Sequence, residues 1–154
     1  MNEAVVGGSL TVAALNLLAA LAGLYAFWTG DPAGTPARVF WPLLRVGQGA
    51  ALMLAIAVGS LAAAGNYSTE SLFYLYALLP LAIGLMAEQL RVASAQTILD
   101  QRGLESSAAV GTLPESEQQE LVAAIMRREL GVMATSAVVV VFLAARAATT
   151  AHGF

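Results

Sequence analysis

The chain has 154 residues, of which 58% are hydrophobic and only 11% are charged, and its mean hydropathy is +0.74. A soluble domain has about a quarter of its residues charged, so this composition excludes a soluble globular domain and a disordered chain, and it indicates an integral membrane protein. Without cysteine or lysine, and with one histidine, the chain has no disulfide, thiolate, Schiff-base or histidine-cluster chemistry, and its net charge of −3 does not favour a nucleic-acid partner.

Four stretches are apolar and long enough to cross a bilayer, which takes about 20 mostly apolar residues. They lie at about residues 4–28, 46–64, 72–87 and 130–148. Residues 29–38 and 65–71 are predicted turns, residues 101–113 form the third connection, and residues 39–44 form an aromatic segment before the second span. We do not expect the first stretch to be a signal peptide, because no positive charge precedes it and its apolar run is too long. The sequence therefore predicts a single transmembrane domain over 1–154, an all-α four-helix transmembrane bundle.

The arginines are distributed unevenly between the two sides of this bundle. The first and third connections and the span ends beside them hold six of them: Arg38, Arg45, Arg91, Arg102, Arg127 and Arg128. The other side has only Arg146, near a helix end. Because arginine is retained on the cytoplasmic side, we expect both termini outside and both of these connections in the cytoplasm of a bacterial plasma (inner) membrane.

The third and fourth helices are predicted to continue beyond the membrane into a cytoplasmic helical hairpin over residues 88–129. Helix formers continue to Gln101, and Gly103 is a candidate C-cap. Thr112-Leu-Pro-Glu115 matches a capping box that would begin the second arm. Each arm has about 14 residues and a length of about 20 Å. The apolar face of the second arm is formed by Leu121, Val122, Ile125 and Val132. The hairpin either packs only on itself or serves as a docking surface for a partner or another protomer.

Small residues recur at every fourth position of the second span. The series is Gly47, Ala51, Ala55, Gly59 and Ala63. Such a ridge lets helix backbones approach closely in lipid. Contact within one chain would by itself explain this ridge, and further pairs, Ala19 with Gly23 and Ala144 with Ala148, leave a homo-oligomer or a partner membrane protein as the alternative. Pro80 is expected to kink the third helix.

Few polar side chains lie at membrane depth, and these are the candidate ligand- or ion-binding residues. They are Asn16, Arg45, Gln48, Glu88 and Arg91. Arg45 and Gln48, like Glu88 and Arg91, are three residues apart and share a helix face. Together they would bind an anionic headgroup or a carboxylate, or line an ion path. The structural interpretation is favoured, because charges at span ends are common: Glu88 pairs with an arginine, and both arginines extend to the interface. Asn16 is expected to form an interhelical hydrogen bond, and His152 to lie in a frayed tail without a metal role.

Three functions are compatible with this set of residues. The favoured one is a non-catalytic accessory or scaffold subunit that acts through helix packing and the hairpin. The alternatives are a small oligomeric transporter or channel, which predicts a cavity reaching Gln48 or Asn16, and a lipid- or amphiphile-handling enzyme, which predicts a lateral groove with Arg45 and Glu88 unpaired. No catalytic triad, carboxylate pair or glycine-rich phosphate loop is present in the spans, so no catalytic residue, metal or cofactor is expected.

Overall fold

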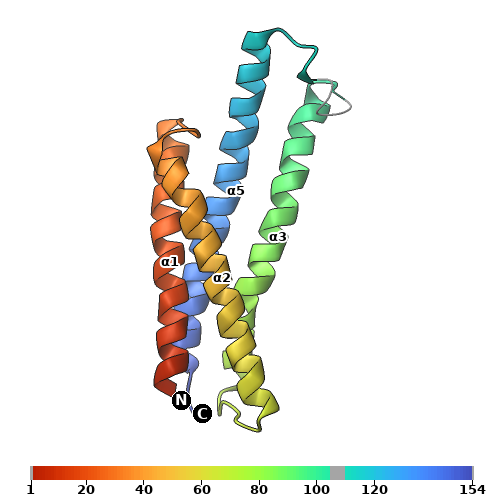
Figure 1. Cartoon of the computed structure of the whole chain (residues 1–154). Coiled ribbons are helices and arrows are strands. Elements are labelled where there is room, and N and C mark those ends of the chain that lie inside the picture. The colour runs from red at the N-terminus through yellow and green to blue at the C-terminus, as the bar shows by residue number, and fades with distance from the viewer. Residues whose placement is uncertain (1, 105–109, 154) are drawn as a thin grey trace.

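A computed structural model describes residues 2–104 and 110–153, and in this part of the chain every regular element is a helix. Helix α1 spans Asn2–Thr29, α2 Thr35–Ala63, α3 Ser71–Gln101 and α5 Glu115–Thr150. Each of these helices is long and apolar enough to cross a membrane, which confirms the predicted all-α class with four apolar helices. Figure 1 shows them side by side, with both chain ends at one end of the bundle. We call this the terminal end, and the opposite one the hairpin end.

Helix α2 is longer than the sequence pattern predicts. The predicted turn over 29–38 is wrong in its second half, because α2 already begins at Thr35, and the aromatic segment 39–44 belongs to the helix. Pro36 lies in the first turn, where a backbone N–H has no intrahelical partner to lose. Pro42 lies inside the helix, which persists there because Phe40 and Leu44 are buried against the rest of the bundle. Tertiary packing thus overrides the local proline signal.

The hairpin formed by α3 and α5 extends past the ends of α1 and α2 (Figure 1). The predicted stop at Gly103 is confirmed: its φ is 69°, its N–H donates to the Asp100 carbonyl at 3.0 Å, and the Leu104 N–H donates to the Leu99 carbonyl at 3.0 Å. Residues 105–109 of the third connection lie outside the described residues.

The capping box predicted at Thr112 is wrong. The residue that precedes α5 is Pro114, and this cap has no side-chain hydrogen bond. The Gln118 amide instead donates to the Leu113 carbonyl at 2.7 Å. The helix starts after the proline, whose ψ of 147° is extended, so Thr112 lies two residues too early to be its N-cap.

Helix α5 is central in the packing, since it contacts α1 along one side and α3 along another, whereas α2 packs mainly on α1 and more sparsely on α3. Two buried clusters hold these helices together. The cluster at the terminal end includes Val12, Phe73 and Val140. The cluster at the hairpin end includes Phe40 and Met133. Every one of these side chains is buried, so the bundle has an apolar interior at each end, and α2 and α3 are the least tightly joined neighbours.

The predicted small-residue ridge of α2 contributes to packing over only part of its length. Gly47 and Ala51 are buried, but Gly59 and Ala63 are exposed. A row of residues four apart turns about 40° around a helix at each step, because one turn takes about 3.6 residues. The buried face of α2 instead follows mixed spacings of three and four from Ala37 to Val58. The predicted ridge therefore turns gradually away from the buried face of α2 towards the outside of the bundle.

The other small-residue pairs are used inside the chain. Ala19, Gly23 and Ala144 are fully or almost fully buried, and Ala148 is 8% exposed. A Cβ atom at Gly23 would lie 2.7 Å from the Phe40 ring and 2.9 Å from the Ala134 Cβ, so α1, α2 and α5 meet there without space for a methyl group. These pairs consequently provide no spare surface for a second protomer.

The C-terminal tail is held in place, so the frayed tail predicted around His152 is wrong. The His152 carbonyl accepts hydrogen bonds from the Thr69 N–H at 3.0 Å and from the Ser68 hydroxyl at 2.9 Å. The Ser68 N–H in turn donates to the Tyr74 hydroxyl at 2.9 Å. The tail therefore closes the terminal end of the bundle by joining α5 to the turn between α2 and α3.

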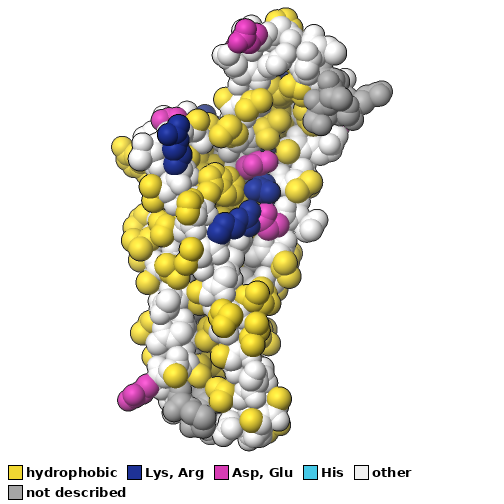
Figure 2. Space-filling view, in the orientation of Figure 1, with side chains coloured by type: hydrophobic (Ala, Val, Ile, Leu, Met, Phe, Trp, Pro, Cys, Tyr) yellow, Lys and Arg dark blue, Asp and Glu magenta, His cyan; other side chains and the backbone are white. Residues whose placement is uncertain are grey.

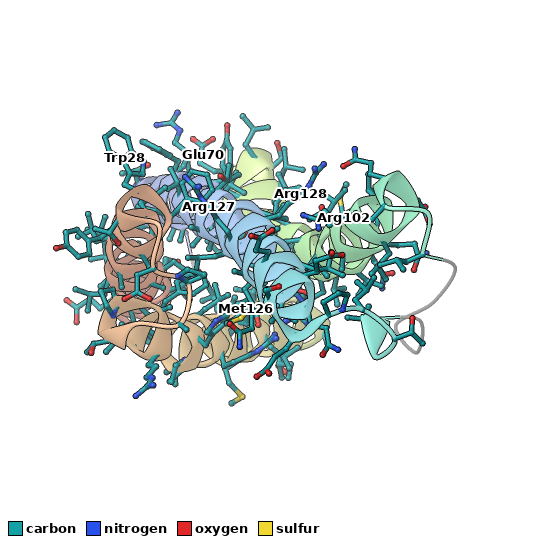
Figure 3. The ribbon with its side chains drawn as sticks, turned by 90° about the horizontal axis from the view of Figure 1, so that it is seen from above. Trp28, Glu70, Arg102, Met126, Arg127 and Arg128 are labelled. Carbon is teal, nitrogen blue, oxygen red and sulfur yellow. The ribbon has the colours of Figure 1, made fainter. Side chains whose placement is uncertain are left out.

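The outside of the bundle is apolar along the middle of the helices and charged towards the hairpin end. Figure 2 shows basic and acidic side chains gathered part of the way up this face, above a broad surface of hydrophobic and neutral side chains. The view from the hairpin end in Figure 3 places Arg127 and Arg128 on one side of α5 and Met126 on another. The exposed apolar side chains of the middle zone include Leu18, Leu52, Ile56, Leu78 and Phe142. So large an apolar surface is suited to contact with lipid.

Candidate functional site

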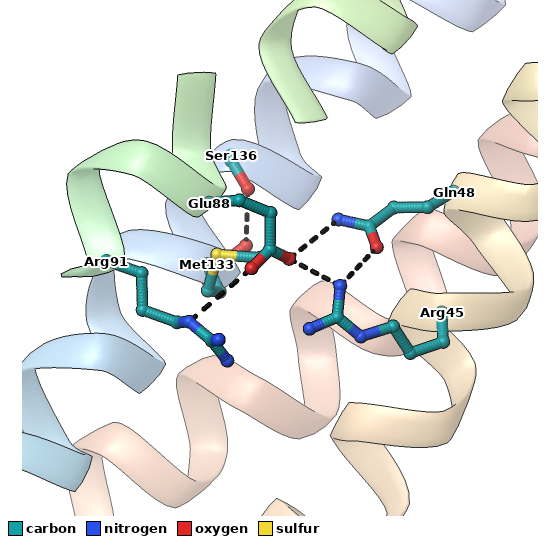
Figure 4. Close-up of polar contacts among 6 residues, drawn as sticks. All are labelled: Arg45, Gln48, Glu88, Arg91, Met133 and Ser136. Atoms are coloured by element: carbon teal, nitrogen blue, oxygen red, sulfur yellow. Dashed lines mark hydrogen bonds and ion pairs between the residues drawn. The ribbon is translucent and has the colours of Figure 1, made fainter. Parts of the chain in front are cut away.

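The structure brings four of the five candidate residues together, on the facing sides of α2 and α3. The centre of this cluster is the Glu88 carboxylate (Figure 4). Glu88 Oε1 pairs with Arg45 Nη1, and Glu88 Oε2 pairs with Arg91 Nε at 3.4 Å. Gln48 completes the cluster by accepting from Arg45 Nη1 at 2.8 Å and donating to Glu88 Oε1 at 3.4 Å. One carboxylate is thus shared between two guanidinium groups.

The local helix geometry explains why these residues meet. Arg45 and Gln48 are separated by one turn of α2, and Glu88 and Arg91 by one turn of α3, so each pair projects from a single face. Both pairs lie where the charge-free stretch of their helix ends, next to Val46 and to Ala87. The turn between α2 and α3 lies at the terminal end, so these helices run in opposite directions and the two pairs reach the same height.

A cation–π contact restrains the cluster from one side. The Arg91 guanidinium lies over the Trp41 ring, 5.6 Å from its centroid, which is within the range of a cation–π interaction. On α5, the Ser136 hydroxyl bonds within its own helix, to the Met133 carbonyl at 2.7 Å, and adds no polar contact to Glu88 (Figure 4). The Arg91 side chain is therefore held between its ion pair with Glu88 on one side and the face of the Trp41 ring on the other.

Arg45 keeps most of its donors available. Its side chain is 49% exposed, and within the described residues only Nη1 of its guanidinium has a hydrogen-bond partner. The side chain of Glu88 is 26% exposed and that of Arg91 is 28% exposed. Two arginines and one glutamate carry a net charge of +1. The cluster is therefore a partly open ion-pair network with an excess of positive charge, which suits an anion better than a cation.

A cavity of about 290 Å³ opens between α2 and α3 directly below this cluster. Its charged and polar wall is formed by Arg45, Gln48 and Glu88, and the remainder is apolar or glycine. The remaining lining residues are Gly49, Ala51, Leu52, Pro80, Leu81, Gly84 and Leu85. We call this cavity, with its charged wall, the α2–α3 groove. Its polarity changes along its length, from ionic at the hairpin end to apolar at Pro80.

Asn16 does not join the cluster, and it does not line the groove. The predicted interhelical hydrogen bond is wrong: Asn16 is buried between α1 and α2, and its Nδ2 donates to the Val12 carbonyl of its own helix at 2.9 Å. A Cβ atom at Gly47 would lie 2.8 Å from this Nδ2, so the amide fills the space that the glycine leaves. Asn16 is therefore a packing residue between the two buried clusters.

The sequence pattern does not show the aromatic partners of the arginines, and it predicts a groove only under the transporter and enzyme alternatives. Arg127 lies over Phe27 at 5.1 Å, and Arg146 over Tyr76 at 5.9 Å. These contacts could have been suspected from depth in the membrane, because each aromatic side chain lies at the same end of the bundle as its arginine. The groove could have been suspected from Gly49 and Gly84, which lie one turn below Arg45 and Glu88. Among residues 2–104 and 110–153, no three histidine, aspartate or glutamate side chains gather in a metal-binding arrangement.

The comparisons with known proteins add no relative: no family model, no curated protein and no solved structure matches the chain. Function therefore has to be argued from the residues alone. The lateral groove expected for a lipid-handling enzyme is present, but the unpaired Arg45 and Glu88 are not, because these two side chains bind each other.

Proposed function

We propose that the chain is a non-catalytic subunit of a membrane assembly, which holds a helical hairpin in the cytoplasm and docks a partner there. The observation that carries the proposal is the reach of α3 and α5. From Glu88 to Gln101 and from Glu115 to Glu129, both helices continue beyond the charge-free stretches by 14 and 15 residues. This is about 20 Å at about 1.5 Å per residue. A hairpin of this length has no role in crossing the bilayer.

The proposed orientation follows from the arginines. Six of the seven lie at the hairpin end or on the hairpin, and Arg146 alone lies near the terminal end. Positive residues next to short loops stay in the cytoplasm, so the hairpin is cytoplasmic and both termini are outside. The same rule applies to a bacterial plasma membrane, which is the location that we propose.

The docking surface lies between the hairpin and the first turn. A cavity of about 410 Å³ separates the turn residues Pro32 and Ala33 from Val122 and Met126 of α5, with Gln118, Gln119 and Ala123 completing its wall. Glu115 and Glu117 precede its lining residues on α5, and Glu120 follows Gln119 within the same stretch. An apolar cavity next to a cluster of negative charge suits an amphipathic protein segment with basic residues. We therefore propose a partner with such a segment.

The docking proposal is tested by making this surface polar. In the double variant Val122→Gln/Met126→Gln, we expect the partner that co-purifies in mild detergent to fall about tenfold, because two apolar contacts are lost. Native mass spectrometry measures the stoichiometry. Val92→Gln is the matched control, since Val92 is 63% exposed on α3 and does not line the cavity. A wild-type chain that purifies without a stoichiometric partner contradicts the proposal. Equal amounts of partner on the double variant and on Val92→Gln contradict it as well.

A second candidate function, a small transporter, is favoured by the groove that reaches Gln48. If ions pass there, Glu88→Gln should lower ion flux in liposomes about tenfold, because the carboxylate holds Arg45 and Gln48 in the wall of the groove. The exposed Glu120→Gln is the control for the same chemical change. Wild-type flux equal to that of empty liposomes would exclude this function.

A further inference from the structure

The α2–α3 groove combines three properties of a site for a charged amphiphile. It has a cationic end, an apolar body and a lateral opening. The apolar body is present because Gly49 and Gly84 have no side chains: a Cβ atom at Gly49 would meet nothing within 4 Å, and one at Gly84 would meet only the Gln48 side chain at 3.8 Å. The flanking Leu52 and Leu85 are 45% and 63% exposed, so the groove opens to the surroundings of the bundle.

The cationic end has the donors that a phosphate requires. Arg45 and Arg91 share a single carboxylate, which leaves one positive charge uncompensated. Among the described residues, Nη2 and Nε of Arg45 and both Nη atoms of Arg91 have no hydrogen-bond partner, and Figure 4 shows the free end of Arg45 directed towards the side of Arg91. Two planar guanidinium groups with free N–H donors match the oxygens of a phosphate diester.

The direction of the groove matches the direction of a lipid. From Glu88 to Pro80 the lining of α3 runs about 12 Å away from the charged end, at about 1.5 Å per residue. In the proposed orientation, the charged end lies at the cytoplasmic interface and the apolar end lies within the hydrocarbon layer. A volume of about 290 Å³ is at the lower limit of small-molecule sites, ~300 Å³ or more, and suits part of one chain and not a whole lipid.

From this juxtaposition, we propose that the α2–α3 groove binds one anionic phospholipid of the cytoplasmic leaflet. Arg45, which lines the groove, binds its phosphate, Arg91 adds positive charge from beyond Glu88, and one acyl chain lies along Gly49 and Gly84. Glu88 pairs with both arginines and competes with the phosphate for their donors. The proposal does not depend on a docked partner, because it concerns the purified chain and lipid alone.

The charge variants test the phosphate contact. The chain is delipidated in detergent and titrated with phosphatidylglycerol or phosphatidylcholine, and bound lipid is measured by native mass spectrometry. We expect a preference for phosphatidylglycerol that Arg45→Gln lowers about fivefold, the effect of one basic residue at an anionic headgroup. Arg102→Gln, which removes the same charge at the far end of α3, should change nothing. The proposal is overturned if the chain binds both lipids equally, or if Arg45→Gln binds phosphatidylglycerol as well as the wild type does.

Glu88→Gln distinguishes a binding site from a structural ion pair, because the two predict opposite signs. Removing the competing carboxylate should raise phosphatidylglycerol binding by about fivefold, the same single-charge effect. Loss of a purely structural ion pair would leave binding unchanged or lower it, and that result counts against the proposal. A poorly folded variant cannot produce the increase, so the measurement stays informative if Arg45→Gln unfolds.

The glycine variants test the acyl chain. Gly49→Leu should fill the groove and weaken phosphatidylglycerol binding by about fivefold or more, since the contact of several methylene groups is lost. Gly59→Leu is the matched control, because a Cβ atom there also meets nothing within 4 Å and Gly59 does not line the groove. If Gly49→Leu binds the lipid normally and soluble glycerol phosphate competes with it, the site takes a free phosphate and the lipid proposal is wrong.

Discussion

Gly23→Leu should lower the unfolding free energy of the chain in detergent by about 3 kcal/mol, the upper part of the range for inserting atoms into a packed core. The reason is the contact of three helices at this position. A Cβ atom at Gly23 would lie 2.7 Å from the Phe40 ring and 2.9 Å from the Ala134 Cβ. The phenyl ring is itself fully buried, and the alanine methyl group is fixed by its backbone, so neither can give way without moving a helix.

Gly7→Leu is the matched control for this variant. Gly7 lies on the same helix, and a Cβ atom there meets nothing within 4 Å. It should leave the unfolding midpoint nearly unchanged, as measured by circular dichroism during heating. If the two variants unfold at the same temperature, α1 does not approach α2 and α5 as closely as described.

Leu121→Ala should destabilise the hairpin by about 2–5 kcal/mol, the range for removing a large buried aliphatic side chain. Leu121 is fully buried, and Leu99 on the opposite arm is 7% exposed, so each arm of the hairpin buries a leucine. The loss should be local, because Leu121 does not belong to either buried cluster of the bundle. Hydrogen exchange measured by mass spectrometry should therefore become faster in 88–101 and 115–129 and stay unchanged in α1.

The neighbouring Val122 provides the control, because its side chain is 48% exposed. Val122→Ala removes a similar apolar group and should leave the exchange of the hairpin nearly unchanged. If the hairpin exchanges hydrogen equally slowly in Leu121→Ala and in the wild type, the two arms do not stabilise each other through this leucine. The hairpin would then be an unsupported pair of helices, which is a poor platform for docking.

The helices could be predicted from the sequence because their signal is large. About 20 consecutive apolar residues bounded by charges have few other solutions than a spanning helix. The ends were harder to predict. Thr35 begins α2 well before its apolar run, since the aromatic residues near Pro42 are held by packing that no local pattern reports. Pro114, and not Thr112, precedes α5, because a threonine and a glutamate at the right spacing cap a helix only if the chain turns there.

The charged cluster could be predicted in part. The sequence shows that a cluster of Arg45, Gln48, Glu88 and Arg91 is geometrically possible, because helix periodicity and depth are both properties of the sequence. Their role as a binding site remains a prediction. The groove beneath them could not be predicted, because its volume depends on how sparsely α2 packs on α3, a distance that only the tertiary structure sets. The place of Asn16 could not be predicted either, because its packing against Gly47, away from the cluster, is also set by the tertiary structure.

The charge-free stretches of the helices differ in length. In α1 it runs from Ala4 to Thr29, whereas in α3 it runs only from Ser71 to Ala87. At about 1.5 Å per residue, these stretches measure about 39 Å and about 26 Å, on either side of a hydrocarbon thickness of about 30 Å. The hydrophobic belt is therefore taller around α1 than around α3, and lipid beside α3 must thin to match it. Such mismatch should enrich the chain in bilayers made of short-chain lipids and should draw short or tilted neighbours to this flank.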